Sequence, residues 1–171
     1  MNRLAAAALA FALATPLAAC TESETDEFRD LVEFQDGMGF DSDLGAFRLV
    51  LSSDSGELTT GRNDLVLHVG FHDPNDPQAE GRGIPNATVL LDAWMPGADT
   101  SMQSEVEVSY LGDGAYALDN VVLTEEGVWN IDLDIAVGEG MYETASLAFR
   151  VSTIGSGSDA DEDEPGGHHH H

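Results

Sequence analysis

The chain has 171 residues, enough for one modest domain. It carries 32 acidic residues against 6 basic ones, all of them arginine, and its formal net charge is -26. Such a negative field repels phosphate groups, which excludes binding to nucleic acid and disfavours docking by charge onto an anionic lipid surface.

The first twenty residues have the pattern of a secretory signal sequence. Arg3 gives a short positive start, and residues 4–19 are an apolar run too short to span a bilayer comfortably. Cys20 follows Leu-Ala-Ala, an ending that resembles a bacterial lipobox. The resemblance implies cleavage before Cys20 and lipidation of its sulfur and of the new amino terminus. We predict a signal peptide over residues 1–19 and lipid attachment at Cys20; the alternative is an ordinary signal peptide with an incidental cysteine.

Lipid anchoring predicts a location in the bacterial cell envelope. Several acyl chains on one residue attach a protein stably to a membrane. Thr21 follows the cysteine, which by the enteric sorting pattern favours the outer membrane over the inner one, facing the periplasm. Because Cys20 is the only cysteine, the domain holds no internal disulfide and no cysteine-ligated metal.

Acidic segments flank the central part of the chain. Residues 20–43 are predicted to form a lipidated acidic tether. Within it, Phe28, Leu31 and Val32 have the spacing of a short amphipathic helix. Residues 154–171 combine glycine, serine and acid with four terminal histidines, and this composition predicts a disordered tail. The histidine run is either native, with affinity for divalent metal, or a purification tag.

Hydrophobic alternation with a period of two dominates residues 44–153. Such alternation indicates strands with one buried face and one solvent-facing side. It predicts strands near residues 47–52, 65–72, 105–110, 129–136 and 147–152, and two more continuously apolar runs, 87–95 and 115–123, bring the number to seven. Turn signals separate these strands, and no helices alternate with them. We therefore predict an all-β fold, a seven-stranded antiparallel immunoglobulin-like β-sandwich with disordered acidic tails and with Trp129 in its core.

The longest predicted connection spans residues 73–85. It carries Asp73, Asp76 and Glu80, whose oxygens suit calcium. The spacing matches no EF-hand, however, and Arg82 adds a competing charge. A solvated hairpin loop is therefore favoured over a calcium loop.

Three stretches occur in an order that resembles a known family. They are Gly61-Arg62-Asn63 before a strand; Gly83-Ile84-Pro85-Asn86-Ala87-Thr88-Val89 leading to Met95-Pro96; and Gly112-Asp113-Gly114-Ala115-Tyr116 leading to Gly127-Val128-Trp129. This order resembles the YtkA-like/FixH-like β-sandwich domains of bacterial envelope proteins over residues 45–152. The resemblance implies an immunoglobulin-like fold outside the cytoplasm and, as in some members, a role in copper handling and cytochrome oxidase assembly.

The resemblance also implies a set of copper ligands. Family members often carry Met-Pro-x-Met-x-His at the turn, where thioether sulfur selects Cu(I) and imidazole accepts either oxidation state. Here Met95 is retained, whereas Ala98 and Thr100 replace the second methionine and the histidine. Met102 lies further along the chain and is the substitute thioether.

Two histidines complete the candidate set. His72, near the mouth of the long loop, is the better ligand, and His68 is the fourth candidate. In a strand four residues span about 13 Å, so both histidines can share one ion only if the chain bends sharply after Phe71. For His68 the alternative is a polar residue on the solvent face. Copper is thus the candidate cofactor, with Met95, Met102, His72 and His68 as its ligands.

The sequence favours binding over catalysis. It contains neither a G-x-S-x-G nucleophile elbow nor a glycine-rich phosphate loop that opens a helix, so we predict that the protein is not an enzyme. We predict a membrane-anchored envelope lipoprotein whose β-sandwich is a binding module with a copper-handling or oxidase-assembly role. The alternative is a cofactor-free protein-interaction or structural module of the envelope. In that case, residues 73–85 and 96–104 are the candidate surfaces for an envelope protein partner.

Overall fold

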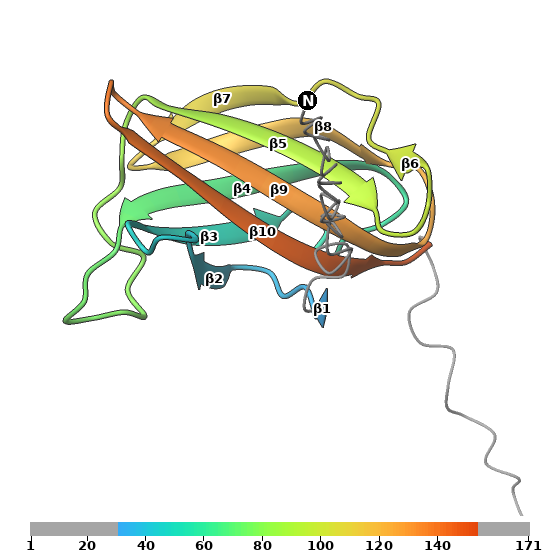
Figure 1. Ribbon diagram of the computed structural model, residues 1–171, viewed down its shortest axis with the longest axis horizontal. Coiled ribbons are helices and arrows are strands. Elements are labelled where there is room, and N and C mark those ends of the chain that lie inside the picture. Colours follow the sequence, from blue (N-terminus) through green and yellow to red (C-terminus); the bar gives the residue numbers. More distant parts are fainter. Residues whose placement is uncertain (1–30, 154–171) are drawn as a thin grey trace, which may run out of the picture.

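The computed structural model describes residues 31–153, which fold into two facing five-stranded sheets (Figure 1). The first sheet contains, in spatial order, β1 (Leu31–Val32), β10 (Met141–Val151), β9 (Gly127–Val137), β5 (Ala87–Met95) and β6 (Thr100–Ser101). The second contains β2 (Met38–Asp41), β3 (Phe47–Ser53), β4 (Gly61–Phe71), β8 (Ala115–Leu123) and β7 (Glu107–Gly112). Neighbouring strands are antiparallel except β1 and β10. The predicted all-β sandwich is confirmed.

Five of these strands were predicted from the alternation and two, β5 and β8, from more continuously apolar runs; three short strands were not predicted. The predicted strands are β3, β4, β5, β7, β8, β9 and β10. The additional strands β1, β2 and β6 have two to four residues, too few for a readable period. Their partners are distant in sequence: Leu31 pairs with Ala148, and Met38 pairs with Leu51.

The first two strands correct the prediction for residues 20–43. Leu31 and Val32 form a strand beside β10 instead of the predicted amphipathic helix. Residues 38–41 pair with β3 inside the second sheet. The described sandwich therefore includes strands within residues 31–43, which were predicted as part of the tether. The predicted signal peptide, Cys20 and the tail over residues 154–171 lie outside the described residues.

The core lies between the inner faces of the two sheets. From β9, the side chains of Trp129, Ile131, Leu133 and Ile135 are all buried, as the alternation predicted. The indole Nε1 of Trp129 donates a 2.9 Å hydrogen bond to the carbonyl of Glu125, which satisfies its polar atom inside the core. Among residues 31–153 there is no helix with the length and apolar character needed to cross a membrane.

We expect Phe34→Ala to lower the free energy of unfolding by about 1–3 kcal/mol, because it removes a half-buried ring from the core edge. Phe34 lies 5.7 Å from Phe149, centroid to centroid, in an edge-to-face arrangement. Urea unfolding followed by tryptophan fluorescence measures the change, with Glu33→Ala as the exposed control. If residues 31–43 were only a tether, both variants would unfold like the wild type.

Candidate functional site

The four predicted copper ligands lie at opposite ends of the sandwich. Met95 ends β5 at one end, and its Cε is near Gly127 at the start of β9. His72 follows the last residue of β4 at the other end, where the connection to β5 begins (Figure 1). Because β4 runs for eleven residues between these ends, at about 3.3 Å per residue, the two side chains are separated by about 30 Å. One ion cannot bind both, so the four residues do not fit a single copper site.

Met95 and Met102 do lie near each other. The amide of Met102 donates a 2.7 Å hydrogen bond to the carbonyl of Ala93, and Met95 pairs with Thr100. The two methionines are therefore diagonal neighbours across β5 and the β6 segment. Both pack against the hydrophobic core, so their present role is to fill space at this end. The pair supplies two thioethers and no imidazole.

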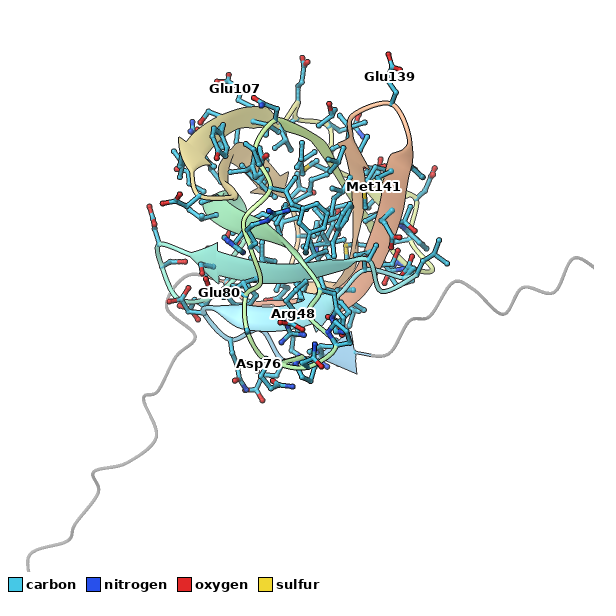
Figure 2. All side chains as sticks on the ribbon, turned by 90° about the vertical axis from the view of Figure 1, so that its left-hand side faces the viewer. Arg48, Asp76, Glu80, Glu107, Glu139 and Met141 are labelled. Carbon is cyan, nitrogen blue, oxygen red and sulfur yellow. The ribbon has the colours of Figure 1, made fainter. Side chains whose placement is uncertain are left out.

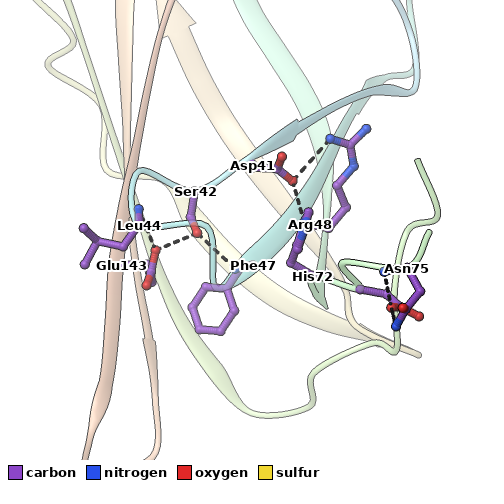
Figure 3. Close-up of polar contacts among 9 residues, drawn as sticks. Asp41, Ser42, Leu44, Phe47, Arg48, His72, Asn75 and Glu143 are labelled. Carbon is purple, nitrogen blue, oxygen red and sulfur yellow. Dashed lines mark hydrogen bonds and ion pairs between the residues drawn. The ribbon is translucent and has the colours of Figure 1, made fainter. Parts of the chain in front are cut away.

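His72 belongs to a small polar chain at the other end (Figure 3). Its Nδ1 lies 3.1 Å from Oδ1 of Asp41, and the same oxygen lies 3.3 Å from a guanidinium nitrogen of Arg48. Asp41 and Arg48 are cross-strand partners on β2 and β3. Sequence reasoning missed both residues because Asp41 was placed in the tether, and no local signal announces the pairing of β2 with β3.

His68 is half-buried beneath the connection between β4 and β5. The chain closes over this part of β4 because Gly70 has no side chain: a Cβ there would lie 2.1 Å from the carbonyl oxygen of Glu80 and 3.1 Å from Cε1 of His68. The Nδ1 atom of His68 is buried and has no hydrogen-bond partner among the described residues. The connection covers the face on which this histidine was expected to meet solvent.

The long connection is a hydrogen-bonded loop. The carboxylate of Asp73 accepts hydrogen bonds from the backbone N–H of Asn75 at 2.9 Å and from its side-chain amide at 3.1 Å. These bonds lower the pKa of Asp73. Within residues 31–153, no three His, Cys, Asp or Glu side chains converge as a metal site. Oδ1 of Asp73 thus binds the loop's own amides.

An open hollow of about 470 Å³ lies beside His72. Phe71, Asp76 and Arg82 contribute to its wall, and the guanidinium of Arg82 sits 5.3 Å above the centre of the Phe71 ring. This cation–π contact holds the part of the loop around Arg82 against the end of β4. The hollow is wide and open, unlike the enclosed apolar pockets that bind small molecules.

Tyr116 fixes the far end of the same loop. Its hydroxyl donates a 2.6 Å hydrogen bond to the carbonyl of Ile84 and accepts a 2.8 Å bond from the amide of Ala87. The ring is buried, and burial raises the pKa of Tyr116. The loop is thus anchored where it enters β5.

The edge of the sandwich formed by β7 carries exposed apolar side chains. The sequence predicted that Val108 and Tyr110 would be buried, since they alternate with Glu107 and Ser109. Instead their side chains are 39% and 45% exposed, and the adjacent Leu111 is 59% exposed. β7 is the last strand of its sheet, and the facing sheet ends in the two-residue strand β6. The alternation correctly predicted a strand but could not predict that nothing would cover it.

The comparisons with known proteins identify the family. The YtkA-like family model matches residues 46–134, and the chain belongs to this family. No curated protein matches it. Two solved structures of FetP from uropathogenic Escherichia coli are similar at 13% sequence identity and a TM-score of 0.46. One is a copper-bound variant and the other is the as-isolated protein. The matched regions cover 68% and 67% of this chain, and 95% and 93% of the respective FetP chains.

We expect Tyr116→Phe to lower the free energy of unfolding by about 1–3 kcal/mol, because the buried amide of Ala87 and carbonyl of Ile84 both lose their partner. The raised pKa means that the stabilisation by Tyr116 is present below about pH 10 and is lost as the pH rises through the folded-state value. Urea unfolding at neutral and alkaline pH measures both effects. Tyr110→Phe is the control, and an equal loss there would contradict the anchoring role.

Proposed function

We propose that this YtkA-like protein is an accessory module of the cell envelope that binds a protein partner through the open edge of its second sheet. The carrying observation is β7, a strand that is exposed along its length and pairs, among the described residues, only with β8. Two-sheet sandwiches commonly use such edges for recognition. The role is binding and not catalysis.

The exposed side chains of β7 support recognition over mere solvation. Natural sheet edges are usually guarded by charged residues or proline along the strand. In β7 the single charge is at Glu107, at its start, and Val108, Tyr110 and Leu111 follow. An apolar edge of this kind is typical of a surface that a partner covers.

Lipid attachment at Cys20 would keep this module on the membrane. The lipobox-like ending before Cys20 supports this part of the proposal. Acyl chains on that residue would hold the domain on the periplasm-facing side of the envelope, with the outer membrane favoured by Thr21. Anchoring restricts the search for a partner to proteins at the same membrane.

A photo-crosslinking amino acid at Ser109 tests the partner proposal in intact cells. Ser109 is exposed on β7, so we expect one discrete adduct with another protein. The same substitution at Asp54, an exposed turn residue outside β7, is the control and should give no such adduct. If the crosslinker at Ser109 gives none, binding of a partner through β7 is wrong.

Copper handling is the second candidate, and membership of the YtkA-like family favours it. Since His72 is at the other end of the sandwich, the described residues that could take part are Met95 and Met102, which together supply soft thioether sulfur. The rest of the implied ligand set is missing there, so this candidate is second to protein binding.

An anaerobic Cu(I) titration of the protein without its histidine tail tests the copper candidate. The candidate requires one bound ion whose affinity falls at least about tenfold in Met95→Leu with Met102→Leu, because both sulfurs are lost while side-chain volume is kept. His72→Gln is the control and should have no effect. Failure to bind Cu(I), or equal binding by the double variant, would remove the candidate and leave the partner proposal intact.

A further inference from the structure

We propose that the partner contributes an extended segment with alternating apolar and basic side chains, which pairs with β7 and fills the groove between β7 and β5. This inference rests on the proposed function and specifies the occupant of the same edge. It follows from the backbone, the groove and the charge at this side of the molecule.

The backbone of β7 offers a template for a further strand. Within residues 31–153, β7 pairs along one edge only, through the register from Glu107 opposite Asp119 to Tyr110 opposite Tyr116. The amide and carbonyl groups on its other edge therefore have no strand to bond with. A bulge after Tyr110 shifts the register before Gly112, so the regular part available to a partner is residues 107–110.

The groove explains why alternate residues of the added segment are apolar. It has a volume of about 230 Å³ and is lined by the apolar Leu91 of β5, Val106 and Val108, and also by Asp92, Ser104 and Glu105. Val108 lies opposite the buried Leu118, so its side chain is on the inner face of the sheet. It remains exposed because β6 pairs with β5 only at Trp94 and Met95 and leaves no strand facing β7. Every second side chain of an added strand would point into this groove.

The remaining side chains of the added segment face an acidic surface. Every charged residue between Arg82 and Arg150 is acidic, and this stretch contains no histidine. On the outer face of the sheet, Glu107 lies directly opposite Asp119. Like charges in this position destabilise a strand pair, and a basic side chain placed beside them would offset the repulsion.

No nearby arginine is free to neutralise the acidic pair of Glu107 and Asp119 among the described residues. Arg62, on β4, is close enough for Asp119 and Glu107 to help raise its pKa, but its guanidinium is already engaged by Asp64 at 3.0 Å. Arg48 lies on the opposite side of the molecule from Glu107 (Figure 2). A second copy of this chain is disfavoured as the occupant, because it would bring the same acidic edge and another net charge of -26.

The test uses the full mature chain and a fluorescein-labelled synthetic peptide in which valine and lysine alternate. We expect saturable binding that weakens as salt is raised. Binding should weaken at least about tenfold in Val108→Glu, which places a charge in the groove. Leu44→Glu makes the same charge change at an exposed leucine outside the groove and should bind like the wild type. Glu107→Gln should weaken binding and reduce its salt dependence.

Two control peptides test whether binding depends on the alternation of side chains and on their positive charge. A peptide of the same composition with its valines and lysines in separate blocks should bind at least about tenfold more weakly, and so should one in which valine and glutamate alternate. Equal binding by the block peptide would show attraction by charge alone and would overturn the inference. A stable dimer of the free chain that Val108→Glu dissociates would assign the edge to a second copy and would also overturn it.

The outcome separates this inference from the proposed function. If the alternating valine–lysine peptide does not bind but the crosslinker at Ser109 still captures a protein, the partner uses different chemistry and only the inference fails. If the crosslinker at Ser109 captures nothing, the proposed function fails with it.

Discussion

The unequal length of the facing edge strands β6 and β7 is the constraint on which this molecule depends. Each sheet buries one side of its strands against the other, and wherever a strand has no counterpart its inward side chains stay exposed. β6 has two residues, whereas β7, in the facing sheet, has six. Val108 and Tyr110 therefore point inward and remain in contact with solvent. The same mismatch leaves the free edge of β7 and the groove beside β5 on one side of the molecule.

The strand pattern was readable because burial in a sandwich follows a period of two. Trp129 and Ile131 are in the core where the alternation placed them. The short strands were not readable, since β1 and β2 exist only through pairing with β10 and β3. For the same reason the partnership of His72 with Asp41 could not be foreseen: it joins residues that only the folded sheet brings together. Val108 is exposed because the facing strand β6 is too short to cover it, and the sequence of β7 cannot show the length of a facing strand.

The candidate metal site retains the family motif only in part. Met95 remains at the turn, but the structure uses it with Met102 as core filling. His68 and His72 lie near the other end of the sandwich, where Asp41 contacts His72 and the loop between β4 and β5 covers His68. The long loop is organised by Tyr116 and by the Asp73 turn. These anchors make that end a stable support and leave the β7 side as the accessible surface.

Hydrogen–deuterium exchange at β7 tests the central claim most directly. In the free protein, the β7 amides that face away from β8 should exchange quickly, because no strand covers them. In a complex with the captured partner they should become protected, while exchange in β9 stays slow in both states. Slow exchange of these amides in the free protein, or an unchanged rate in the complex, would contradict the account.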